Sequence, residues 1–124
     1  MNFNFTPQVQ EVKVPEWNPG KDEKLYVSEL TGAEYVTFER YARLVMFGKG
    51  TPEECREAYA QIAVRYAKKA DGTPFFLLSQ LEILANGNSK PLRRIFEKLA
   101  EINNLDDETA KELEKNLPST ANAE

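Results

Sequence analysis

Three features of this sequence combine residue types that can do chemistry, and the first is a glycine–lysine pair at positions 48–49. A phosphate-binding P-loop needs a further glycine five residues before its Gly-Lys pair, and a serine or threonine directly after the lysine. Arg43 and Gly50 occupy those two positions. The segment therefore predicts a loop between two helices and no nucleotide-binding site.

The second and third features are a group of carboxylates, Glu53, Glu54 and Glu57, and the lone cysteine among them, Cys55. Close carboxylates can hold a metal or share a proton, but the sequence has no histidine, the commonest general base. No second carboxylate set accompanies them, so we interpret them as a solvated helix face. Because Cys55 has no basic neighbour to activate it, we expect a small buried hydrophobic residue. We predict no enzyme and no catalytic, cofactor-binding or metal site.

The composition limits the class of protein. A chain of 124 residues is long enough for one domain with one modest core. Its formal net charge of -4 gives no general attraction to nucleic acids or anionic membranes. A single cysteine fits a reducing compartment, and neither a signal peptide nor an apolar run of roughly 20 residues is found. We expect a cytoplasmic protein with one domain over residues 1–117 and a disordered tail over 118–124.

The hydrophobic spacing predicts a mainly α (α+β) fold, with about five helices and an N-terminal β-hairpin packed on the helical core. Residues 10–14 and 25–27 alternate apolar and polar side chains, and the turn-forming segment 15–22 separates them. Two Thr-x-x-Glu capping boxes, at Thr31 and Thr51, predict the starts of two helices.

Residues 71–105 form the segment around which the other elements are expected to pack. Its opening Asp-Gly-Thr-Pro predicts a turn in which Thr73 caps a helix over 75–85. After a break at 86–88, apolar residues spaced by three and four predict another helix, and Asp106 is the expected cap of a last short one. The expected core includes Phe38, Val45, Ile62, Tyr66, Leu78, Leu81, Ile95, Phe96, Leu99 and Ile102.

Several short motifs follow one another in a specific order. First comes an Asp-Gly-x-Pro-[Leu/Phe]-Phe turn at 71–76, followed by a Leu-x-x-Leu helix and a Gly-Asn break at 87–88. A Leu-x-x-[Ile/Leu]-Phe helix follows the break, and an Asn-Leu pair at 104–105 then leads into an acidic segment. Upstream, residues 25–34 read LYVSELTGAE, a strand followed by the start of a helix. This order, which spans residues 12–116, resembles the tail assembly chaperones of long-tailed (siphovirus-type) bacteriophages.

The resemblance implies a chaperone that acts in the host cell cytoplasm during virion morphogenesis and is absent from the mature virion. In that family the protein binds the tape measure protein, keeps it soluble and helps recruit tail tube subunits. The implied partners are therefore the phage tape measure protein and the major tail tube protein. A second copy of the chain and a frameshift-extended form of it are further candidate partners, whereas no cofactor, nucleic acid or membrane is expected.

Apolar residues in the expected loops and N-terminal arm are the candidates for contact with a partner. They are Phe3, Phe5, Trp17, Met46, Phe47 and Phe76. Each has a structural alternative. The arm that carries the first two can be a frayed terminus, and the tryptophan can cover the small core.

A rival interpretation belongs to another class of protein. Residues 77–96 can form a helix-turn-helix with Gly87 in the turn. The start of its recognition helix would carry Ser89, Lys90, Arg93 and Arg94. The acidic net charge opposes DNA binding, as do Glu97 and Glu101 further along the same helix.

The family resemblance also predicts a longer product of the same gene, made by a programmed −1 frameshift. Residues 114–116, Glu-Lys-Asn, can be encoded GAA-AAA-AAC, which contains the slippery heptamer A-AAA-AAC. Residues 67–69 could be encoded in a slippery form as well, but a slip there would remove part of the helical core. Gene sequencing and mass spectrometry test this prediction. It fails if no −1 frame is open at the 3′ end, or if no larger product shares the N-terminal peptides.

Overall fold

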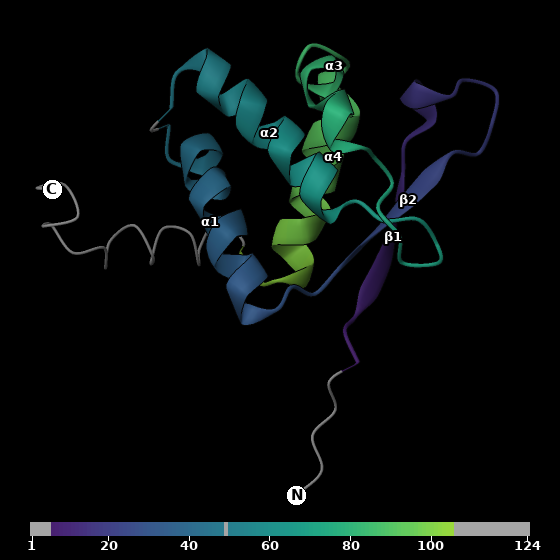
Figure 1. Cartoon of the computed structure of the whole chain (residues 1–124), viewed down its shortest axis with the longest axis horizontal. Helices are drawn as coiled ribbons and strands as arrows, with labels where there is room; N and C mark the ends of the chain where they lie inside the picture. The colour runs from purple at the N-terminus through teal and green to yellow at the C-terminus, as the bar shows by residue number, and fades with distance from the viewer. Residues whose placement is uncertain (1–5, 49, 106–124) are drawn as a thin grey trace, which may run out of the picture.

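The computed structural model describes residues 6–48 and 50–105, and these form an antiparallel β-hairpin followed by four α-helices (Figure 1). The elements are β1 (Val9–Lys13), β2 (Lys24–Ser28), α1 (Gly32–Met46), α2 (Pro52–Tyr66), α3 (Leu81–Ala85) and α4 (Ser89–Ile102). Two 3₁₀ helices, Pro15–Trp17 and Leu78–Gln80, precede β2 and α3 respectively. The predicted α+β class with an N-terminal hairpin is confirmed. The expected last helix, tail and slip site lie outside the described residues.

The hairpin pairs Val9 with Ser28 at one end and Lys13 with Lys24 at the other. Val12, Leu25 and Val27 on its inward face are buried, which explains the alternation in the sequence. On the other edge of β2, the backbone of Tyr26 exchanges two hydrogen bonds of 2.8 Å with Lys68. A two-stranded sheet is marginal by itself, so it depends on the helix that covers it. That helix is α4, which packs against both strands.

Both capping boxes form as predicted. The Thr31 hydroxyl accepts a hydrogen bond from the Glu34 amide, and the Glu34 carboxylate accepts one from the Thr31 amide, at 3.2 and 2.9 Å. Thr51 and Glu54 repeat the arrangement at 3.1 and 2.8 Å. Each box thus satisfies two backbone amides at the start of its helix that would otherwise lack a hydrogen-bond acceptor.

The core is centred on α2, which packs against α1, α3 and α4. Aromatic rings link three of these helices: Phe38 of α1 lies 6.0 Å from Tyr66 of α2 and 5.9 Å from Phe96 of α4. Most of the predicted core is buried, namely Phe38, Ile62, Tyr66, Ile95, Phe96, Leu99 and Ile102. Val45 and Leu81 are partly buried against it. Leu78 was wrongly assigned to the core, because its side chain is 71% exposed.

The error at Leu78 has its cause in the preceding turn. Thr73 does not cap a helix: its hydroxyl and its amide both donate to the Asp71 carboxylate, at 2.6 and 3.0 Å. The chain then pairs with Lys68 at Pro74 and bends at Phe75 and Phe76, with the Phe75 amide bonded to the Ala67 carbonyl at 2.9 Å. The predicted helix over 75–85 is therefore wrong in its first half, and α3 begins only at Leu81.

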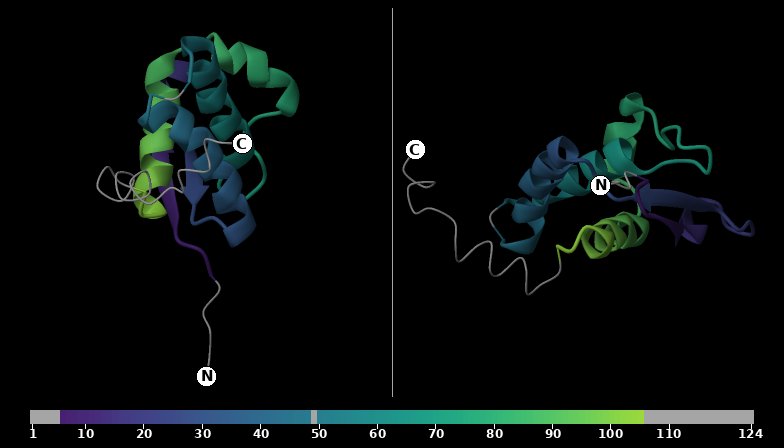
Figure 2. Two further views of the ribbon diagram at one scale, coloured as in Figure 1. Left: turned by 90° about the vertical axis from the view of Figure 1, so that its left-hand side faces the viewer. Right: turned by 90° about the horizontal axis from the view of Figure 1, so that it is seen from below.

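The hairpin loop and the segment between α2 and α3 lie at the same end of the molecule, away from α1 (Figure 2). Their proximity follows from the bridges that join Lys68 to Tyr26 and to Pro74. The chain thus brings residues 15–23 and 75–88 together, although about 60 positions separate them.

We predict that Phe96→Ala lowers the free energy of unfolding by about 3–5 kcal/mol, because it leaves a cavity in the core. The ring is 7% exposed and packs edge-to-face on Tyr59 at 5.8 Å. Leu78→Ala is the matched control and should change the free energy by less than about 0.5 kcal/mol, since that side chain is exposed. Urea denaturation measures both. Equal effects of the two changes would contradict the placement of α4.

Candidate partner-binding surface

The carboxylates and the cysteine that suggested chemistry in the sequence have structural contacts or face solvent. Among the described residues, no group of three or more His, Cys, Asp or Glu side chains could hold a metal ion. The Cys55 thiol is partly buried, not fully as expected, and donates to the Leu44 carbonyl at 3.3 Å. Glu54 serves its capping box, and Glu53 and Glu57 are exposed. No helix in the described ranges is long and apolar enough to cross a membrane.

Two of the predicted partner-binding residues meet on the surface. The rings of Trp17 and Phe76 lie 5.3 Å apart in an edge-to-face contact, and Phe75 makes a second edge-to-face contact with Phe76 at 4.9 Å. A groove of about 460 Å³ opens at this contact, between the hairpin loop and α3. Its lining includes Trp17, Asn18, Glu23, Phe75, Phe76 and Ile83. We refer to it as the Trp17 groove.

Exposed apolar side chains lie in the segment that contributes one wall of the Trp17 groove; Ile83 lines the groove, and Leu77 and Leu78 directly follow the lining residue Phe76. Leu77, Leu78 and Ile83 are 67%, 71% and 72% exposed, and all three belong to the short segment that forms one wall. Sequence reasoning placed Leu78 in the core and passed over the other two, because it expected one continuous helix from Phe75. Large apolar side chains that gather on a surface usually mark a binding site. This end of the molecule is therefore the strongest candidate for partner contact.

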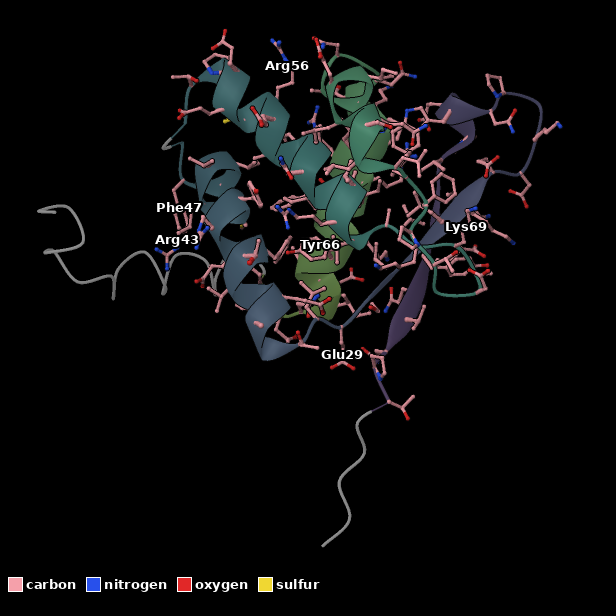
Figure 3. All side chains as sticks on the ribbon, in the orientation of Figure 1. Glu29, Arg43, Phe47, Arg56, Tyr66 and Lys69 are labelled. Carbon is pink, nitrogen blue, oxygen red and sulfur yellow. The ribbon has the colours of Figure 1, made fainter. Side chains whose placement is uncertain are left out.

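The other predicted contact residues are not in the Trp17 groove. Phe47 lies at the C-terminal end of α1, far from the hairpin (Figure 3). It and Met46 are partly buried against the core and border a tight hollow with Leu105. Phe3 and Phe5 fall outside the described residues. The role of these four residues stays a prediction.

An ion pair fixes the hairpin loop that carries Trp17. The two terminal nitrogens of the Arg94 guanidinium, Nη1 and Nη2, donate to the Glu16 carboxylate at 3.0 and 2.7 Å, and Nη1 also donates to the Lys13 carbonyl at 2.7 Å. This two-pronged geometry is the stronger form of such pairs. The hydrogen bond from Arg94, followed by one from the Glu16 backbone, lowers the pKa of Glu16 from 4.5 to about 2. No local pattern in the sequence indicates a pair 78 residues apart.

The same contact weakens the helix-turn-helix hypothesis. Arg94, one of its four expected DNA contacts, is engaged with the hairpin. The helix before the turn, α3, has only five residues, so it is too short to cross a DNA backbone as the first helix of the motif does. Lys90 and Arg93 are exposed at the start of α4.

Comparison with known proteins bears on the fold. No protein-family model and no curated protein matches this sequence. A solved structure, that of the bacteriophage HK97 tail assembly chaperone, superposes with a TM-score of 0.55. The match covers 84% of this chain and 88% of that one, at 15% identity. This chain has a tail-assembly-chaperone-like fold. The structural likeness agrees with the resemblance in the order of sequence motifs, and the chaperone-like fold presents the Trp17 groove at the hairpin end.

We predict that the Glu16–Arg94 pair contributes to stability in a pH-dependent way. Because the native state lowers the pKa of Glu16, the contribution is complete above pH 4.5 and is lost as the pH falls towards 2. The difference in free energy of unfolding between the wild type and Glu16→Gln should therefore shrink over that range. Urea denaturation at several pH values measures it, and Arg94→Met should show the same trend. A difference that stays constant with pH would contradict the pairing.

Proposed function

We propose that this protein is a phage tail assembly chaperone. It binds the tape measure protein, keeps that protein soluble and helps recruit tail tube subunits while the tail is built. The observation that carries the proposal is the chaperone-like fold over 84% of the chain, together with the order of motifs in the sequence. The proposed place of action is the cytoplasm of the infected host, and the protein would be absent from the finished virion.

The physical task of such a chaperone is to cover apolar surface for a limited time. A long, mostly helical tape measure protein exposes apolar helix faces before the tube encloses them, and these faces would otherwise aggregate. The Trp17 groove and the exposed side chains of Leu77, Leu78 and Ile83 offer a complementary apolar surface. Covering a partner reversibly requires no reaction, so the proposed role is not enzymatic.

Release is proposed to follow from competition. The sequence contains no P-loop pattern, so we do not assign an ATP-driven step to the chain. Tail tube subunits that bury the same apolar faces over a larger area would displace the chaperone by mass action. Under this proposal, tube growth and chaperone departure are a single exchange.

Co-expression with the phage's tape measure protein tests the proposal. We expect the tape measure protein to be recovered in the soluble fraction with this protein and in the pellet without it. Phe96→Ala, which should disrupt the core, is the control for a requirement of the folded state. If the tape measure protein is equally soluble when expressed alone, the proposed function is wrong.

A further inference from the structure

We propose that the Trp17 groove binds an amphipathic helix whose apolar stripe is flanked by lysine and arginine residues, and that another protein supplies this helix. The inference rests on the proposed function, in which the tape measure protein is the partner. The inference specifies the place on this chain where the partner binds and the kind of partner side chains that the groove recognises. Apolar exposure, the state of the groove's backbone and the surrounding charge each support it.

Among the described residues, three of the five exposed large apolar residues lie in the segment 77–83. Leu77, Leu78 and Ile83 each leave more than two thirds of the side chain in solvent, within seven positions of the sequence. Beside them lies the groove, with the edge-to-face rings of Trp17 and Phe76 in its wall. Transfer of such side chains out of water is the main favourable term in association. A partner must therefore bring an apolar stripe of its own.

The backbone around the groove favours a helix over an extended segment. An added strand needs free amides and carbonyls along an edge. The Asn18 amide is bonded to the Pro15 carbonyl at 3.2 Å, and the Gly87 amide to the Leu84 carbonyl at 3.1 Å. The Leu77 amide is bonded to the Gln80 side chain at 2.8 Å. These donors are already used, whereas a helix satisfies its own backbone and presents only side chains.

The charged residues around the groove indicate which side chains flank the apolar stripe of the partner helix. Glu23 lines the Trp17 groove, and on the other side of α3 a second hollow of about 390 Å³ is lined by Glu53, Glu57, Glu82 and Arg56. The two hollows thus carry four carboxylates against one guanidinium, and none of these five groups forms an ion pair with another described residue. Of the five, only Glu23 lines the groove itself, where it accepts a hydrogen bond from the Asn18 side chain at 2.9 Å. Lys90, exposed at the start of α4, is a cation on the Glu16 side. Lysine and arginine beside the stripe would complement this acidic border and speed encounter.

The sole tryptophan of the chain lies in the groove and allows a direct measurement. The probe is a synthetic amphipathic helix of leucine and lysine, and its counterpart keeps the leucine stripe but carries glutamate in place of lysine. Titration of Trp17 fluorescence should give a saturable change with the lysine peptide and a Kd at least about tenfold weaker with the glutamate peptide. Equal affinity for the two peptides would overturn the charge argument, and no change with either would overturn the proposal.

A matched pair of variants tests the location. Ile83→Glu removes an apolar side chain from the groove wall, and the loss of this contact with the leucine stripe should weaken binding of the lysine peptide by at least about tenfold. Val36→Glu makes the same change on α1, where the side chain is 59% exposed, and should leave the affinity unchanged. Circular dichroism checks that both remain folded. Equal weakening by both variants would overturn the location.

Sedimentation of the wild type without peptide tests whether a second copy of this chain occupies the groove instead. We expect Ile83→Glu to leave the molecular mass unchanged. A wild-type oligomer that Ile83→Glu dissociates, with no binding of the lysine peptide, would assign the groove to a second copy of this chain and overturn the proposal.

Co-expression separates this inference from the proposed function. Ile83→Glu should lose the ability to keep the tape measure protein soluble, and Val36→Glu should retain it. If both variants retain it, the groove is not the binding site although the function stands. If the wild type binds the lysine peptide but does not keep the tape measure protein soluble, the proposed function fails and the groove remains a site for cationic helices.

Discussion

The packing of α4 against the hairpin is the contact on which the other parts of this molecule depend. A two-stranded sheet has one apolar face and little stability alone, so Val12, Leu25 and Val27 need a partner layer. The apolar face of α4 supplies it, and the same helix packs against α2, where the Phe96 ring lies 5.8 Å from the Tyr59 ring. The hairpin and the helical core thus share one buried layer, and neither is complete without α4.

The packing of α4 against the hairpin also fixes the positions of the walls of the Trp17 groove. Arg94 extends from α4 to Glu16 and to the Lys13 carbonyl, and so holds the 3₁₀ turn that ends at Trp17. The opposite wall is placed by the bridge between Lys68 and Pro74, which turns the chain back towards the hairpin. Both walls are therefore tied to the folded core, and the groove requires no ordering of a loose loop before it can bind.

The features that could be predicted from the sequence are those with a local cause. The capping boxes at Thr31 and Thr51 and the hairpin alternation depend on neighbours within a few positions, and these predictions are confirmed. The helix expected from Phe75 was wrong because Asp71 competes for the Thr73 side chain and Lys68 pairs with Pro74. Trp17 and Phe76 could be named as candidates, but their contact could not, since it depends on pairings between segments far apart in the chain.

The acidic border of the groove has a further consequence for how binding would respond to its surroundings. Glu53, Glu57 and Glu82 near the groove are exposed, so dissolved salt screens their attraction to a cationic partner. Ionic strength is then the variable that acts on them. At physiological salt the screening length is about 8 Å, shorter than two turns of a helix. Each copy of the protein would therefore sense only the stretch of partner that it touches, and copies bound along one long helix would act independently of one another's charge.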